Sequence, residues 1–280
     1  MTEFFGEINS IKICYEIQGE GYPLILVHGF GGKKEDWIAQ FIPLSKHFKV
    51  IRFDNRGAGK SERPNLPYTM EMFVDDTRGL MDFLNIEKAH LMGWSLGGMI
   101  VQNFVLKYPE YVNKVVLIAS NHSFLNKDAP KLYKEMQIKR LEEINDNPEK
   151  VFWEEVRRGF YREFRKKMMA DPKKKFYGLW SAEDLIKESQ INPPTSTDLE
   201  NLANALKNHN TYDQLQNIKQ PSLLISPSHD IILPKSHMHD MNQLIPNSIL
   251  KTINKAGHDV PLSRALEVNE LIISFLNNGL

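Results

Sequence analysis

The sequence of 280 residues predicts an α/β protein built on a doubly wound, mostly parallel sheet. Three observations lead to this prediction. Short apolar runs bounded by turn residues recur along the chain, and most are apolar throughout, as in strands covered on both faces. Amphipathic helical patterns lie between these runs. A long central stretch with helical patterns and no strand pattern interrupts the alternation.

The predicted strands form an early group and a late group. Each is a run rich in Val, Ile and Leu that ends at Gly, Pro, Asn, Asp or Ser. The early strands are 11–18, 23–29, 49–54, 88–93 and 114–120, and the late strands are 221–226 and 248–253.

Three helices are predicted between and after these strands. The first runs from Thr69, whose side chain can cap the N-terminus, to about Leu84. The second starts at Leu96 and ends before Pro109, which cannot continue a helix. The third is the amphipathic segment 265–276. Alternation of these helices with strands is typical of a sheet covered on both faces.

The central region 121–207 contains helical patterns at 129–144 and 151–164 and no convincing strand. A helical stretch of this length between two strands is typical of a lid. We therefore expect residues 1–120 and 208–280 to form the core, and 121–207 to form an inserted helical cap.

Two helix starts inside this cap are predicted from capping boxes. In this motif a Ser or Thr side chain and an acidic side chain three residues later each bond the other's backbone N–H. The pairs are Ser181 with Asp184 and Thr197 with Glu200.

Charge and composition exclude several classes of function. Lys and Arg number 35 and Asp and Glu number 35, so the basic excess typical of a nucleic-acid partner is missing. No apolar run approaches the roughly 20 residues that span a bilayer, and the N-terminus lacks a signal-peptide pattern. The only cysteine, Cys14, lies in a predicted strand and cannot form an intrachain disulfide. We expect a cytoplasmic protein without a membrane or nucleic-acid partner.

The segment GWSLGG, residues 93–98, contains the pattern G-x-S-x-G. It follows a predicted strand and opens a predicted helix, which is the context of a nucleophile elbow. Gly93 and Gly97 leave room for the neighbouring backbone, and the helix N-terminus favours negative charge. Ser95 is therefore the candidate nucleophile.

A serine hydroxyl needs a base to take its proton and an acid to orient that base. Asp230 follows the late strand 221–226, and His258 follows the last strand. Loops at the carboxyl ends of parallel strands gather at one edge of the sheet, where α/β proteins place their chemistry. The predicted triad is Ser95, His258 and Asp230.

The glycine-rich segment HGFGG, residues 28–32, can supply an oxyanion hole, because it follows a strand and its backbone N–H groups are free to face a ligand. We assign the two donors as the N–H groups of Phe30 and Leu96. Trp94 flanks the nucleophile and is the candidate for contact with substrate.

Together these motifs resemble those of α/β-hydrolase-fold serine hydrolases with a helical cap. The resemblance covers both ends of the chain, and only the cap lacks family motifs. It implies a carboxylic ester hydrolase (EC 3.1.1), of the carboxylesterase or enol-lactonase kind, that needs no cofactor. Its expected substrates are small esters or lactones, cleaved through an acyl-enzyme. The matching residues are HGFGG at 28–32, DNRGAGKS at 54–61, GWSLGG at 93–98, Asp230, and GHDVPL at 257–262.

Two alternatives share the same triad and stay open. Members of this family with similar caps also hydrolyse carbon–carbon bonds in diketone-type compounds. A binding or receptor protein with little turnover is possible on the same fold. The natural substrate, stereoselectivity and oligomeric state do not follow from the sequence.

The segment HMHD, residues 237–240, was weighed as a metal site. Metal-dependent lactonases carry two histidines spaced by one residue and then an Asp–His pair, whereas Met241 stands here in place of the last histidine. The segment also has a helical pattern, and residues two apart on a helix do not face each other. No metal site is expected.

Overall fold

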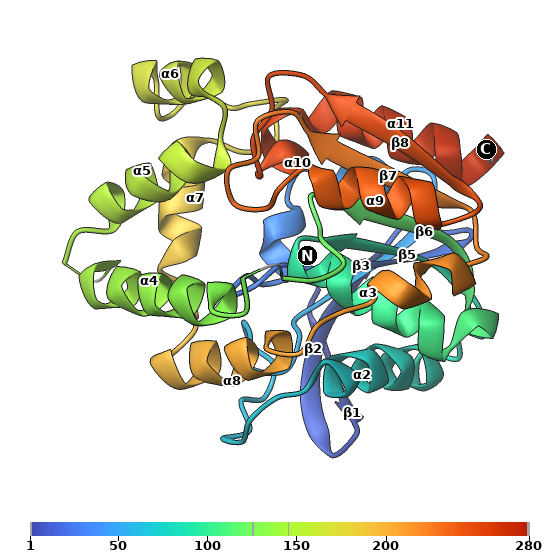
Figure 1. Ribbon diagram of the computed structural model, residues 1–280. Helices are drawn as coiled ribbons and strands as arrows, with labels where there is room; N and C mark the ends of the chain where they lie inside the picture. Colours follow the sequence, from blue (N-terminus) through green and yellow to red (C-terminus); the bar gives the residue numbers. More distant parts are fainter. Residues whose placement is uncertain (1, 125, 145, 279–280) are drawn as a thin grey trace.

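The computed structural model describes residues 2–124, 126–144 and 146–278. At its centre lies an eight-stranded sheet with the order β1-β2-β4-β3-β5-β6-β7-β8 (Figure 1). β2 pairs antiparallel with β1 and β4, and the pairs from β4 across to β8 are parallel. The strands are β1 Phe4–Ile8, β2 Ile11–Gln18, β3 Pro23–Val27, β4 Lys49–Phe53, β5 Ala89–Trp94, β6 Val112–Ile118, β7 Ser222–Pro227 and β8 Ser248–Ile253. The predicted mostly parallel α/β sheet is confirmed.

The helices fall into groups that cover the two faces of the sheet and one group between β6 and β7. The helices outside that interval are α1 Phe41–Ser45, α2 Met70–Phe83, α3 Leu96–Lys107, α9 Ser236–Leu244, α10 Val260–Ser263 and α11 Ala265–Asn278. Between the two strands lie α4 Ala129–Ile144, α5 Pro148–Gly159, α6 Arg162–Ala170, α7 Ala182–Ser189 and α8 Ser196–Leu206. Among the described residues, no helix has the length and apolar character needed to cross a membrane.

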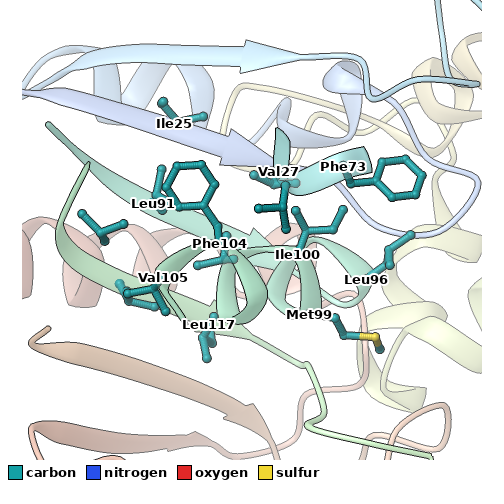
Figure 2. Close-up of a cluster of buried hydrophobic side chains, with 14 of the residues drawn as sticks. Ile25, Val27, Phe73, Leu91, Leu96, Met99, Ile100, Phe104, Val105 and Leu117 are labelled. Atoms are coloured by element: carbon teal, nitrogen blue, oxygen red, sulfur yellow. The ribbon is translucent and has the colours of Figure 1, made fainter. Parts of the chain in front are cut away.

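Alternate residues of the central strands face opposite sides of the sheet, as a period of two requires. On β3, Ile25 and Val27 belong to the apolar cluster under α2 and α3, which Figure 2 shows together with Phe104. Leu24 and Leu26 belong instead to the cluster under α1 and α11. Both faces are buried, so the strands are apolar throughout, and the sheet is a rigid platform for the loops at its carboxyl edge.

Helices α4 to α7 gather beside the sheet, on the left in Figure 1. Helices α5, α6 and α7 and the loop before α7 share an aromatic cluster that includes Phe152, Phe160 and Trp180. This cluster contacts the core through small or aliphatic residues, among them Leu262 and Ala265. The helices α5 to α7 thus share a cluster of their own, whereas α8 packs into the cluster under α2 and α3 through Leu199, Leu202 and Leu206.

Two local features differ from the sequence prediction. Strand β1 was missed, because its residues alternate poorly and both Phe4 and Phe5 are exposed at the sheet edge. The capping box of Ser181 is present, but the helix α8 is capped by Thr195 with Asp198, two residues earlier than predicted. The reason is that α8 begins directly after Pro194, and the Asp198 carboxylate accepts from both the N–H and the hydroxyl of Thr195, each at 2.7 Å.

Candidate active site

Ser95 stands alone between β5 and α3 in a left-handed backbone conformation, with φ 56° and ψ −120°. Non-glycine residues adopt such angles at a cost, and only where the surroundings hold them. Here the N–H of Ser95 donates to Ile118 O at 3.0 Å, and its carbonyl accepts from Ser120 Oγ at 2.9 Å. The neighbouring strand β6 and the residues after it therefore hold the strained turn in place.

The two glycines of the motif are required by close packing. A Cβ on Gly93 would lie 2.2 Å from Gly97 O, and a Cβ on Gly97 would lie 1.9 Å from Val27 O. Both distances are far inside van der Waals contact, so larger residues would push α3 away from the sheet. This close approach aims the N-terminus of α3 at Ser95.

Asp230 and His258 are joined as the sequence predicts. Asp230 lies in the loop after β7 and His258 in the loop after β8, and His258 Nδ1 is 2.8 Å from Asp230 Oδ2. The other carboxylate oxygen of Asp230 accepts from the N–H groups of Ile232 and Leu233, at 2.8 and 3.0 Å. With Nδ1–H donated to the carboxylate, Nε2 of His258 carries a lone pair. Ser95 and His258 line the same cavity.

The charge of His258 is set by opposing effects. Burial disfavours the imidazolium, but the Asp230 carboxylate favours it through its charge and hydrogen bond, and Asp259 adds to this. The balance raises the pKa of His258 above its ordinary value. Burial also raises the pKa of Asp259 to about 7, against the opposing charge of His258.

The glycine-rich loop runs directly beside the nucleophile. A Cβ on Gly29 would lie 3.4 Å from Ser95 Cβ. His28 braces the loop, since its Nε2 accepts from the Asn55 N–H at 3.1 Å and its Nδ1 is left to donate to Gly29 O at 2.9 Å. Phe30 follows this anchored turn and lines the cavity next to Ser95.

The second assigned donor, Leu96, opens α3, so its N–H has no partner within the helix. Phe30 and Leu96 thus both lie beside Ser95, and their N–H groups remain the predicted oxyanion donors.

The segment DNRGAGKS is a scaffold beneath this loop. The Asp54 carboxylate accepts from the N–H groups of Lys34 and Lys60, at 2.8 and 2.9 Å. Arg56 forms a buried two-pronged pair with Asp76, at 2.6 and 2.7 Å. The contact between Asp54 and Lys34 ties the loops after β3 and β4 together, and the pair of Arg56 and Asp76 ties the loop after β4 to α2.

Two cavities meet at Ser95. The smaller, about 200 Å³, holds His258 and Asp259 from the core and Arg140 and Glu155 from the helices after β6. The larger, about 450 Å³, is lined mainly by apolar side chains, among them Met99, Phe124, Met136, Leu206 and Leu233. Phe30, Ser95, Tyr133 and Ile232 line both cavities, so the candidate nucleophile sits where they join.

The residue Trp94 lines the smaller cavity but is largely covered. Its indole Nε1–H donates to His258 O at 3.1 Å, and its ring packs 6.0 Å from the imidazole. Trp94 therefore holds the histidine loop as well as forming part of the cavity wall.

Two lining residues were missed by sequence reasoning. Tyr133 on α4 packs edge-on against Phe30, with ring centroids 5.2 Å apart, and lines both cavities. Asp259 directly follows His258, and no sequence pattern pointed to its raised pKa. Only the helical pattern of 129–144 pointed to α4, and it did not show which side faces Ser95.

A contact between α5 and the histidine loop depends on two glycines. The N–H of Asp259 donates to Gly159 O at 2.8 Å. A Cβ on Gly257 would lie 2.4 Å from that carbonyl, and a Cβ on Gly159 would lie 1.8 Å from Asp259 Oδ2. The C-terminal end of α5 therefore packs backbone to backbone on the loop that carries His258.

Comparison with known proteins agrees with this geometry. The family model described as alpha/beta hydrolase fold matches residues 22–265. The chain belongs to the α/β-hydrolase family. A protein of Synechocystis sp., provisionally named a non-heme chloroperoxidase, is 30% identical over 97% of this chain and 98% of its own length.

Two solved structures of α/β hydrolases share the whole fold. The enol-lactonase from Burkholderia xenovorans LB400 has a TM-score of 0.81 and 22% identity, covering 98% of this chain and all of its own. The meta-cleavage product hydrolase from Pseudomonas fluorescens IP01 has a TM-score of 0.80 and 22% identity, covering 99% and 98%. Both likenesses concern the fold alone.

The HMHD segment of this α/β hydrolase takes part in a cluster that its own spacing did not predict. His237 and Asp240 are three residues apart on α9 and meet His122, which follows β6. The sequence predicted no metal because His237 and His239 do not face each other on a helix, whereas the cluster contains only His237 of these two. The second imidazole comes from a residue 115 positions away.

Proposed function

We propose that this α/β hydrolase is a serine hydrolase that cleaves small carboxylic esters or lactones through an acyl-enzyme on Ser95. The observation that carries this proposal is the bond of 2.8 Å between His258 and Asp230, with His258 and the strained Ser95 lining one cavity. This arrangement supports a base that is oriented by a carboxylate, desolvated, and in the same cavity as a half-buried hydroxyl.

The reaction begins when His258 Nε2 takes the Ser95 proton and Oγ attacks the substrate carbonyl carbon. The N–H groups of Phe30 and Leu96 bind the resulting oxyanion. His258 then gives the proton to the leaving alkoxide, and the acyl-enzyme remains. Water, deprotonated by His258, attacks the acyl carbon, and the proton returns to Ser95 Oγ as the carboxylic acid leaves. In a lactone, the alcohol and the acid are two ends of one product.

The two cavities favour a substrate with unlike ends. We place the apolar part of the substrate in the larger cavity, beside Met99 and Met136. We place the polar part in the smaller cavity, near Arg140 and Glu155. Trp94 is proposed to contact this polar part. A small molecule is the expected partner, because the junction at Ser95 is enclosed by α4 and the glycine-rich loop.

The division into a core, 1–120 and 208–280, and a cap, 121–207, is part of the proposal. It is supported by the separate aromatic cluster of α5 to α7 and by the cap residues in both cavities. In this division the core carries the chemistry and the cap defines the substrate. A cytoplasmic location remains our expectation from the sequence.

Hydrolysis of a carbon–carbon bond is the second candidate. It is supported by the whole-length likeness to a hydrolase of meta-cleavage products, together with the carbon–carbon hydrolysis that the family resemblance implies. The same triad would serve it. The enol-lactonase likeness supports the ester and lactone proposal in the same way.

The test is a panel assay of wild type and Ser95→Ala with p-nitrophenyl esters of increasing acyl length, several lactones and one vinylogous diketone. A fluorophosphonate label with mass spectrometry identifies the modified residue in the same samples. Label on Ser95 with ester or lactone turnover supports the proposal. Label with diketone turnover alone favours carbon–carbon hydrolysis. Label without any turnover favours a receptor, and neither label nor turnover contradicts all three functions.

A further inference from the structure

A second group of chemically active side chains lies beside the larger cavity. His122 follows β6, while His237 and Asp240 lie on the first two turns of α9. His122 Nε2 is 2.9 Å from His237 Nδ1 and 3.4 Å from Asp240 Oδ2. One potential ligand atom from each residue lies within 4.8 Å of the other two.

The two imidazoles suit metal coordination better than surface solvation. His122 and His237 are each 3% exposed, and their facing ring nitrogens lie 2.9 Å apart. Neutral imidazole nitrogen is the form that binds metals. Asp240 is more exposed and keeps a carboxylate on the open side of the cluster.

A hydrogen-bond partner on the side of His122 that faces away from the cluster orients its ring. Its Nδ1 lies 2.9 Å from Ser123 Oγ, which can accept the Nδ1–H and leave Nε2 with a lone pair toward the cluster. Partners of this kind fix the tautomer of ligating histidines. The short contact between His122 Nε2 and His237 Nδ1 then requires one proton between the two nitrogens. A metal would displace that proton, which His237 can carry on Nε2 instead.

The spacing of these atoms agrees with a tetrahedral ion. Zinc binds imidazole nitrogen at about 2.0–2.1 Å, which places neighbouring ligand atoms roughly 3.3 Å apart. The pair His122–Asp240, at 3.4 Å, fits without change. The pair His122–His237, at 2.9 Å, has to open by a few tenths of an ångström, which a small rotation of either ring provides.

We propose that His122, His237 and Asp240 form a binding site for a divalent transition metal of the zinc class. Three protein ligands leave a coordination position free, as in sites that also bind water or a ligand. His237 lines the larger cavity together with Ser95. The metal would therefore add a positive charge to the wall of that cavity.

The experiment is calorimetric titration of the chelator-treated full-length protein with Zn²⁺, accompanied by Co²⁺ absorption spectra. We expect one ion per chain and visible Co²⁺ bands of tetrahedral intensity. His237→Ala and Asp240→Ala should each weaken binding by at least about tenfold, the lower end of what even a lost supporting residue costs. The matched control is His239→Ala, an exposed histidine on the same helix, which should bind as wild type does.

Asp240→Ala keeps the test independent of folding, because its side chain is 42% exposed and its loss leaves no buried gap. Absence of binding by the wild-type protein would overturn the proposal. Equal affinity in wild type, His237→Ala and Asp240→Ala would overturn it too, because the ion would then bind elsewhere. No substrate is used, so the outcome does not depend on the proposed hydrolase function.

Discussion

The sheet core and the helices between β6 and β7 build their interiors from different residues. Branched aliphatic side chains such as Ile25, Leu91 and Val116 cover both faces of the central strands, with aromatic rings contributed mainly by the helices and loops around them. Large aromatic rings such as Phe160 and Trp180 fill the cluster of α5 to α7. The sheet core therefore fixes the backbone around Ser95, whereas the helices between β6 and β7 contribute side chains that line the two cavities. We expect changes in the first region to abolish chemistry and changes in the second to alter selectivity.

The largest expected effect tests the core directly. Ser95→Ala should lower kcat by about 10⁴- to 10⁶-fold, as loss of a nucleophile does in other serine hydrolases. His258→Ala should cost about as much, because the two residues act as a unit. Thermal unfolding should change little, since the Ser95 side chain lines two cavities. The measurements are steady-state kinetics and the Tm of each variant. Activity retained in Ser95→Ala would contradict the assignment.

A smaller loss is expected for Asp230→Asn. The variant keeps the shape of the side chain but weakens the orientation of His258, and the cost should be about 10²- to 10⁴-fold in kcat. Removing the carboxylate charge should also lower the pKa of His258. The check is a pH profile of kcat/KM, whose acid limb should move to lower pH. Wild-type activity in this variant would point to another acid.

The comparison between the two regions is sharpened by Tyr133→Ala on α4. Tyr133 lines both cavities, so its removal should enlarge them and change the relative kcat/KM for long and short acyl esters by about tenfold. The reactivity of Ser95 toward a small fluorophosphonate should stay within a fewfold of wild type. Unchanged selectivity would show that the cap does not define the substrate. A large loss of labelling would show that it also supports the chemistry.

The smallest effect is expected from Asp259→Asn. The Asp259 charge contributes to the raised pKa of His258, so the acid limb of kcat/KM should shift to lower pH by a fraction of a unit. The measurement is the pH profile beside that of Asp230→Asn, which should shift further. An acid limb that moves to higher pH would contradict the proposed charge interaction.

The pH dependence of stability tests the protonation of Asp259 independently of the kinetics. The pKa of Asp259 is about 7 in the folded protein and 3.8 in its ordinary state, so the folded chain holds a proton that the unfolded chain has released. Between these values the free energy of unfolding of wild type therefore falls as pH rises. Asp259→Asn should remove that slope in denaturant unfolding at several pH values. The same slope in both proteins would mean that Asp259 is ionised in the folded state.

The sequence predicted the core well because its signals are local. The strand before Ser95 and the helix after it are both visible in the residues next to the serine. The positions of Asp230 and His258 followed from a general rule about carboxyl ends of strands. Strand β1 was missed because an exposed edge strand carries little alternation.

The cap was predicted as helical, but its relation to the site was not. Tyr133 reaches Ser95 only through the packing of α4, which residues 129–144 do not specify by themselves. His122 and His237 are 115 positions apart in the sequence, and the residues around neither of them indicate that the two side chains meet. Such contacts depend on how residues 121–207 pack onto the sheet core, and the hydrophobic periodicity of a segment carries no information about this packing.

The contact between Gly159 and the loop that carries His258 limits which helical insertions could replace the one in this protein. A side chain grafted at position 159 would meet the Asp259 carboxylate, which would have to turn away. A replacement with glycine and a free carbonyl at this position avoids that collision and keeps the hydrogen bond from the Asp259 N–H. The insertion is therefore attached directly to the loop that carries His258.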